Sequence, residues 1–176
     1  MFDDGRGKKV IVLVHCVLNQ NARMYPYAKH KGAVTEIIDF LMKKDYGMLQ
    51  IPCPEFLFMG LERLKRTKEH PEVWHVLNLP EGRKKCRKIA EDIAMQIRQY
   101  IDNGFYVAAV LGKNASPSCG VTISSVGDDL IPGPGVFIQE LQKVFEEQNI
   151  NVPIVGCPNA ENESEEVLDW LKANLK

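Results

Sequence analysis

Apolar positions along this chain of 176 residues follow two different patterns. Four short, mainly apolar segments are predicted strands, and the first is a β-branched run of the kind that is buried on both faces of a sheet. They occupy residues 9–14, 48–52, 105–111 and 152–156. Four other segments carry apolar side chains at helical spacing, with polar side chains between them. These are residues 32–44, 82–103, 136–149 and 164–175.

This alternation of strands and helices predicts parallel βαβ units with right-handed crossovers. We therefore expect a single Rossmann-like three-layer α/β domain over residues 1–176, with a mainly parallel sheet of about four to five strands. We place the four strands in the spatial order 2-1-3-4. Ligand sites in such sheets lie beyond the carboxyl ends of the strands, where the strand order reverses. Here that point falls between the first and third strands.

The remaining segments show neither the apolar pattern of strands nor the helical spacing. We expect a polar loop around residues 19–21 and a loop at 112–120, followed by a short extended piece at 121–124. Residues 54–80 are expected to be irregular apart from one short helical turn, because Pro71 and Pro80 interrupt them.

The composition is that of a water-soluble globular protein, with 45% apolar and 26% charged residues. Because 22 lysines and arginines nearly balance 23 aspartates and glutamates, no large field favours nucleic acid or an anionic membrane. Two basic clusters, at 63–68 and 84–88, are expected to be solvated faces. The first apolar run is too short for a signal peptide or a membrane span, so we expect a cytoplasmic protein with reduced thiols.

The five cysteines are odd in number, widely spaced and without a Cys-x-x-Cys pair, so a disulfide framework is not expected. Cys86 lies on the apolar stripe of the helix at 82–103 and should be a core residue. The other four follow or end the predicted strands: Cys16, Cys53, Cys119 and Cys157. Neighbouring strands are about 4.8 Å apart, so three thiolates from adjacent strand ends can close around a cubane iron–sulfur cluster.

Four segments resemble, in order, the motifs of the thiouracil desulfurase family. They are His-Cys-Val-Leu-Asn at 15–19, Pro-Cys-Pro-Glu at 52–55, Ser-Pro-Ser-Cys-Gly at 116–120 and Pro-Gly-Pro-Gly-Val at 132–136. The resemblance extends over residues 9–157, and the Asn-Gln-Asn at 19–21 is similar to a divergent, desulfurase-related desulfidase branch. It implies a [4Fe-4S] cluster held by Cys16, Cys53 and Cys119, with one iron left open as a Lewis acid.

The same resemblance implies a non-redox reaction in which water replaces the sulfur of a small thiolated compound, such as a thiouracil-like heterocycle. Sulfur would leave as hydrosulfide. Glu55 is then the candidate acid or base, and Ser116 and Ser118 would orient substrate or water. These three residues also fit plainer roles, since Glu55 can be a surface carboxylate at a helix start and serines often cap loops. His15 stays outside the catalytic set.

Two features keep other functions open. Typical members of the family carry a further cysteine where this chain has residues 21–25, Asn-Ala-Arg-Met-Tyr. Cys157 lies outside the motifs, and we rank an inert or sulfur-handling role above ligation because the fourth strand lies farthest from Cys53. If Cys157 were a ligand, the chain would be a non-catalytic iron–sulfur or zinc-binding protein with a closed four-cysteine site. A cluster-free thiol enzyme would instead use Cys53 or Cys119 as its nucleophile.

Overall fold

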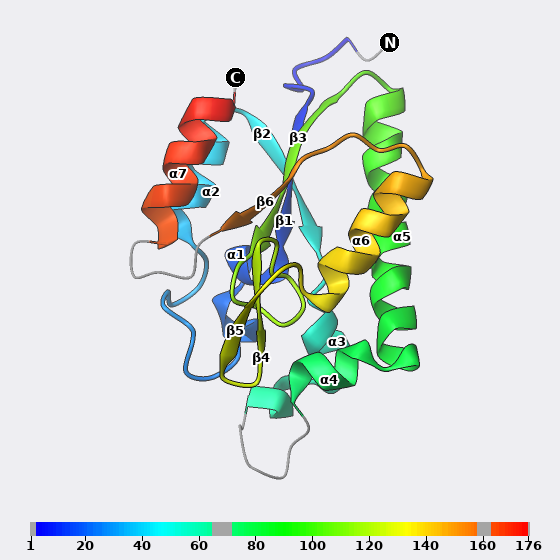
Figure 1. Cartoon of the computed structure of the whole chain (residues 1–176). Helices are drawn as coiled ribbons and strands as arrows, with labels where there is room; N and C mark the ends of the chain where they lie inside the picture. The colour runs from blue at the N-terminus through cyan, green and yellow to red at the C-terminus, as the bar shows by residue number, and fades with distance from the viewer. Residues whose placement is uncertain (1–2, 65–71, 158–162, 176) are drawn as a thin grey trace.

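Four parallel strands form the central sheet of the computed structural model, which describes residues 3–64, 72–157 and 163–175. Their order is β2 (Tyr46–Ile51), β1 (Lys9–Val14), β3 (Tyr106–Lys113) and β6 (Ile154–Cys157). This is the predicted order, and it places the reversal of strand order between β1 and β3. All three ladders are parallel, so every strand ends at the same edge of the sheet, the lower one in Figure 1.

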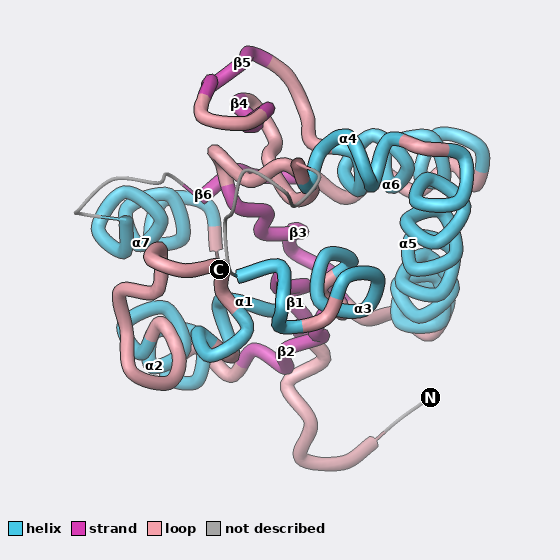
Figure 2. Tube along the Cα trace, turned by 90° about the horizontal axis from the view of Figure 1, so that it is seen from below, coloured by secondary structure: helices cyan, strands magenta, loops and turns pink. Residues whose placement is uncertain are grey.

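Helices cover both faces of this sheet and complete a three-layer α/β fold, which confirms the predicted fold class. On one face lie α2 (Thr35–Lys43) and α7 (Glu163–Asn174). On the other lie α5 (Pro80–Asp102) and α6 (Val136–Glu147), and Figures 1 and 2 show both pairs from two directions. The predicted boundaries of these helices hold to within three residues at either end.

The core is built where the strands meet the inner stripes of the helices. In β1 every residue after Lys9 is buried, as its unbroken apolar run predicts for a central parallel strand. On the inner stripe of α5, Cys86, Ile93 and Ile97 are each at most 1% exposed. Phe137 and Leu141 of α6 are fully buried as well. The prediction that Cys86 is a core residue is therefore confirmed.

Two segments expected to be irregular contain regular structure. The chain after β1 forms α1 (His15–Leu18) and the 3-10 turn η1 (Gln20–Ala22). The chain after β2 forms α3 (Pro54–Met59), η2 (Leu61–Leu64) and α4 (Val73–Asn78), where one short turn was predicted. These pieces are too short for a periodic pattern. Capping contacts stabilise them instead: the Asn19 side chain accepts from the N–H of Asn21, and Pro54 begins α3.

A β-hairpin stands apart from the central sheet beside the carboxyl ends of its strands (Figures 1 and 2). It consists of β4 (Ile123–Val126) and β5 (Asp129–Pro132), and the second strand was not predicted. Gly127 at its tip has a φ of 63°, a conformation that favours glycine. The N–H of Gly127 also donates to Glu72 Oε1 at 2.5 Å, which ties the tip to the start of α4.

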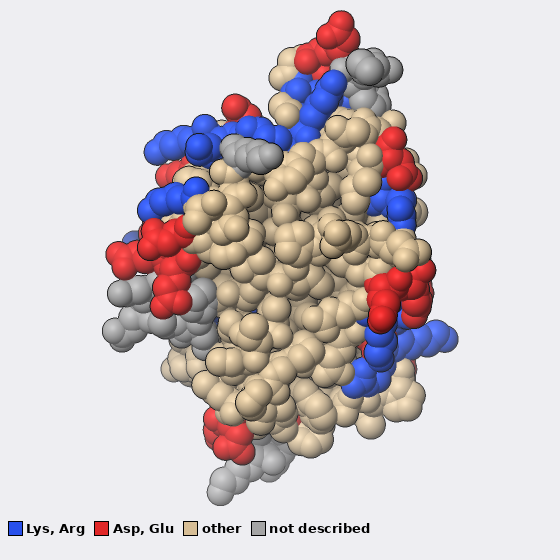
Figure 3. Space-filling model, turned by 45° about the horizontal axis from the view of Figure 1, so that its top comes forward, with Lys and Arg blue, Asp and Glu red and all other residues tan. Residues whose placement is uncertain are grey.

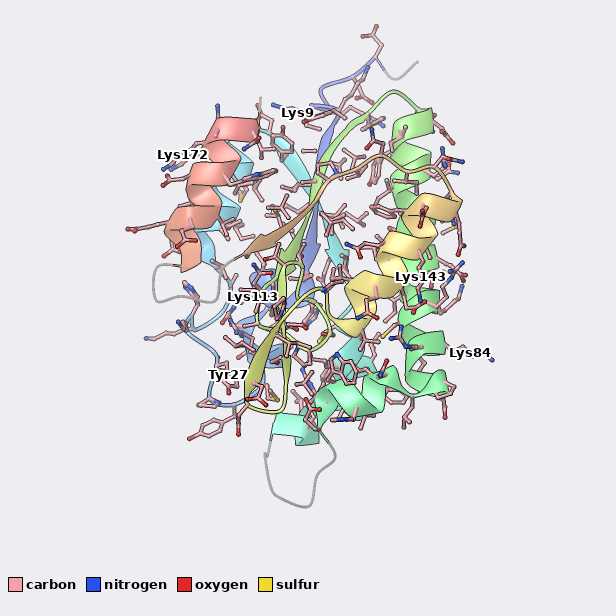
Figure 4. The ribbon with its side chains drawn as sticks, in the orientation of Figure 1. Lys9, Tyr27, Lys84, Lys113, Lys143 and Lys172 are labelled. Carbon is pink, nitrogen blue, oxygen red and sulfur yellow. The ribbon has the colours of Figure 1, made fainter. Side chains whose placement is uncertain are left out.

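Charges of both signs are mixed along the outline of the face shown in Figure 3, and neither sign forms a continuous field there. No helix among the described residues is both long enough and apolar enough to span a membrane. Of the basic cluster on α5, Lys84, Lys85 and Lys88 are exposed as predicted, and Figure 4 shows Lys84 pointing outward. In the other cluster the prediction is wrong for Arg63, which is buried; residues 65–68 lie outside the described part.

Candidate functional site

A cavity of about 170 Å³ lies at the carboxyl ends of β1, β2 and β3. Three cysteines from three different segments line it: Cys16 in α1, Cys53 directly before α3, and Cys119 in the loop after β3. Glu55, Ser116 and Ser118 line it as well, so all six site residues predicted from the sequence border one space. Figure 2 looks at this end of the sheet, where α1 and α3 lie beside each other. The rings of His15 and Phe56 stack across that contact, 6.3 Å apart.

Local backbone structure holds each cysteine in place. The carbonyl of Cys16 accepts from the buried Gln20 side chain at 2.6 Å. Cys53 is the N-cap of α3, and its Sγ accepts from the N–H of Phe56 at 3.4 Å. The N–H of Cys119 donates to Ser116 Oγ at 3.0 Å. Turn and cap geometry of this kind positions a thiol without any period in the sequence.

The Ser-Pro-Ser-Cys-Gly and Pro-Gly-Pro-Gly motifs pack on each other, and close backbone contacts explain Gly120 and Gly135. A Cβ at Gly120 would lie 2.4 Å from the carbonyl oxygen of Ile123, and one at Gly135 would lie 2.6 Å from the backbone of Ser118. Backbone N–H groups at the start of α6 donate to carbonyls of the loop, from Val136 to Pro117 at 3.0 Å and from Phe137 to Ser118 at 3.1 Å. The second motif therefore clamps the loop that carries Ser118 and Cys119.

Burial dominates the electrostatics of the thiols. It raises the pKa of Cys53 to about 12, with a smaller contribution from Glu55, and it raises the pKa of Cys119 well above its ordinary value. The charge of Cys16 raises the pKa of both, and that of Cys53 raises the pKa of Cys119, so the three sulfur atoms act on one another. Without a metal Cys53 and Cys119 are neutral thiols near pH 7. A bound metal would have to displace their protons.

Glu55 and Ser118 form the central polar pair of the cavity. Ser118 is fully buried, and its hydroxyl lies 2.6 Å from Glu55 Oε1 and 3.4 Å from Cys119 Sγ. A hydroxyl has one proton, so the shorter contact, donation to the carboxylate, prevails. Ser116 Oγ lies 3.3 Å from the same carboxylate oxygen and 3.3 Å from Ser118 Oγ. The result is a carboxylate with two hydroxyls beside a sulfur atom.

Two buried cationic residues of the cavity wall were missed from the sequence. Arg63 was assigned to a solvated basic cluster, but its side chain is 1% exposed and its Nε lies 3.5 Å from Glu55 Oε2. Lys113 ends β3, is buried, and lines the cavity (Figure 4). One feature of the sequence points to each of these two residues. Lys113 extends a buried strand, and Glu55 needs a counter-charge if it faces the site.

His15, which lies outside the catalytic set predicted from the sequence, also lines the cavity. Its Nδ1 makes a hydrogen bond with Gln50 Nε2. Burial, with a further effect of the Arg63 charge, lowers the pKa of this imidazole. His15 is therefore a neutral ring in the wall near pH 7.

Cys157 and Cys86 are not among the residues that line the cavity. Cys157 ends β6, pairs in register with Lys113 and is 1% exposed. Among the residues that the structure describes, no three His, Cys, Asp or Glu side chains lie close enough to hold a single metal ion. Cysteines around a cubane bind different irons and need not converge on one point. Three thiols on one cavity, each within electrostatic reach of the others, fit such a cluster.

Comparisons with known proteins agree with the fold. No family model matches the chain. An uncharacterized protein of Methanocaldococcus jannaschii is 27% identical over 171 residues, which cover 97% of this chain and 99% of that protein. Among solved structures, the [4Fe-4S]-dependent thiouracil desulfidase TudS matches with a TM-score of 0.50 and 19% identity, over 94% of this chain and 99% of that one. This likeness shows that the two chains share a fold.

Proposed function

We propose that this chain is a [4Fe-4S]-dependent, non-redox desulfidase that removes sulfur from a small thiolated compound, with residues 1–176 acting as one domain. The observation that carries the proposal is the meeting of Cys16, Cys53 and Cys119 on one cavity that also contains the Glu55–Ser118 pair. The shared fold with a thiouracil desulfidase supports it. A thiouracil-like heterocycle is the substrate class we propose.

The three cysteines would hold the cluster, each binding one iron. When bound, the cluster supplies an iron without a protein ligand, which is a Lewis acid for a thiocarbonyl sulfur. The overall reaction consumes one water. A C–O bond forms, the C–S bond breaks, and sulfur leaves as hydrosulfide, so no electrons are gained or lost. Such a site needs reduced thiols, which points to the cytoplasm as its location.

The chain's own residues would handle the protons. Glu55 Oε1 already accepts from the Ser118 hydroxyl at 2.6 Å, within the range for proton transfer. The carboxylate can therefore take the Ser118 proton while the Ser118 oxygen takes one from the attacking water, as the new C–O bond forms. Ser116 lies 3.3 Å from both partners and holds the carboxylate in that orientation. The fully buried Ser118 side chain limits competing water at this point.

The described geometry disfavours the two alternative functions. A closed four-cysteine site needs Cys157, which does not line the cavity and belongs to the strand at the sheet edge away from β2. A thiol nucleophile needs a lowered pKa, whereas burial raises the pKa of Cys53 to about 12.

The test is anaerobic reconstitution with iron and sulfide, followed by incubation with 2-thiouracil. We expect about four irons and four sulfides per chain, and release of hydrosulfide together with uracil. Cys119→Ala should lose both properties, while the matched variant Cys157→Ala keeps them. A wild-type protein that takes up no cluster would refute the proposal. Uptake that also depends on Cys157 would support a closed, non-catalytic site.

A further inference from the structure

Arg63 is a cavity-wall side chain held by several hydrogen bonds, and the reaction described above does not use it. Its Nη1 donates to the carbonyl of Gly60 at 2.7 Å, and its Nη2 donates to the carbonyl of Ala22 at 2.6 Å. The same Nη2 lies 3.8 Å from Cys53 Sγ. The guanidinium therefore connects the segment that follows Cys16 with the segment that carries Cys53 and Glu55.

The position of this charge matches a local electrostatic problem. Cys53 and Glu55 are two residues apart, line the same cavity, and become two neighbouring negative charges once Cys53 binds a metal as thiolate. Like charges in a buried site repel strongly unless a cation lies between them. Arg63 contacts both, through Nη2 on the sulfur side and Nε on the carboxylate side.

The hydrogen bonding of the Arg63 Nε group depends on how the Glu55 carboxylate is oriented. This Nε is fully buried and has no hydrogen-bond partner among the described residues, although Glu55 Oε2 is 3.5 Å away. Glu55 Oε1 is meanwhile held by Ser118. A small rotation of the carboxylate would satisfy Nε and would change the orientation of the oxygen that faces Ser118.

We propose that Arg63 is a positioning residue, whose fixed positive charge holds the Cys53 sulfur and the Glu55 carboxylate side by side and ties both to the loop after Cys16. Its effect on a cluster rests on the proposed function, whereas its pairing with Glu55 does not. Lysine would keep the charge but lacks the planar fork that reaches Gly60, Ala22 and Glu55 together.

The first test needs no cluster. A double-mutant cycle with Arg63→Met and Glu55→Gln on urea unfolding of the apo protein measures the coupling between the two side chains. We expect the double variant to be destabilised by clearly less than the sum of the single variants. Additive effects would overturn the pairing. Arg63→Lys provides a second variant that folds if the methionine variant does not.

The second test measures the reduction potential of the reconstituted cluster. A nearby positive charge favours the reduced, more negative state, so Arg63→Met should lower the potential while Arg63→Lys stays near the wild-type value. The Lys variant should still lower kcat, with little change in KM, because it keeps the charge and loses the fork. Equal potentials in the wild type and the Met variant would overturn the electrostatic role.

Arg83 offers a matched control. It is a partly buried arginine of α5 that bonds Asn78, Gln139 and Glu140, outside the cavity. Arg83→Met should reduce stability, as a purely structural arginine does, and should leave the potential unchanged. If the wild type takes up no cluster, the proposed function fails, and the unfolding cycle still decides whether Arg63 pairs with Glu55.

Discussion

The cysteines of this chain fall into two groups that share one residue type and differ in their neighbours. Cys53 and Cys86 are the clearest pair, because burial raises the pKa of both to about 12. Cys86 projects from a helix stripe into the apolar core and is fully buried. Cys53 borders a cavity, accepts a backbone N–H and has Arg63 beside it.

Burial and a raised pKa therefore do not by themselves mark a functional thiol. What separates the groups is polar support. The cavity cysteines are surrounded by hydroxyls, a carboxylate and a guanidinium, all of which cost free energy to bury and would be replaced by apolar side chains in a plain core. The core cysteines are small apolar side chains in effect.

The largest expected effect is on iron content when a single cysteine is replaced by alanine. Cys53→Ala should reduce the iron content after anaerobic reconstitution from about four per chain to near zero, because a ligand is lost. Cys86→Ala should leave the iron content unchanged. Iron and acid-labile sulfide assays on the two variants decide it, and equal losses in both would place Cys86 in the site.

The polar support should matter most for turnover. We expect Glu55→Gln and Ser118→Ala to lower kcat by about 100- to 10,000-fold, the range of general acid–base catalysis, with normal cluster content. Ser124→Ala is the matched control, since Ser124 is a buried serine whose Oγ has no hydrogen-bond partner among the described residues and does not line the cavity. Steady-state hydrosulfide release measures all three. A normal kcat in Ser118→Ala would exclude that hydroxyl from the reaction.

One cysteine of each group should contribute alike to the pH dependence of the folding stability of the apo protein. The thiols of Cys53 and Cys86 have folded pKa values of about 12, above the ordinary value of 9.0. Between these values the unfolded chain loses protons that the folded chain keeps, so stability is complete below pH 9 and falls as pH rises toward 12. The loss is at most about 1.4 kcal/mol per pH unit for each thiol. Urea unfolding at pH 8 and 10.5 should show a shallower fall in Cys53→Ala and in Cys86→Ala.

The smallest expected effect is on the free energy of unfolding. Here the core cysteine should matter more than the cavity cysteine, the reverse of the order for iron binding. Cys86→Ala leaves a small void in a closely packed core and should cost about 1 kcal/mol of unfolding free energy. Cys16→Ala, at a half-buried position on the cavity, should cost less than about 0.5 kcal/mol in the apo protein. Urea midpoints at pH 7 compare the two. A larger loss in Cys16→Ala would mean that the cavity thiols are packed like the core.

Much of the architecture could be predicted because it is encoded locally. The unbroken apolar run of β1 matches its observed bounds, and the stripe of α5 identifies Cys86 as a core residue. The strand order was a hypothesis for a parallel α/β sheet of four strands, and the structure confirms it. The three strand-end cysteines were found in the same way, because parallel strands finish at one edge of the sheet. Their meeting on one cavity is therefore a consequence of topology.

The features that sequence patterns did not reveal depend on contacts between residues far apart in the chain. Arg63 looked like part of a solvated basic run, and its burial becomes visible only when Ala22 and Glu55 are brought to it. Two motifs far apart in the chain proved to be in contact, with Gly135 against the backbone of Ser118. Composition and periodicity report which side chains prefer burial. They do not report which polar partners the fold brings to a side chain. Hydrogen bonds and ion pairs with such partners can make a buried charge stable at a position where the pattern predicts exposure to solvent.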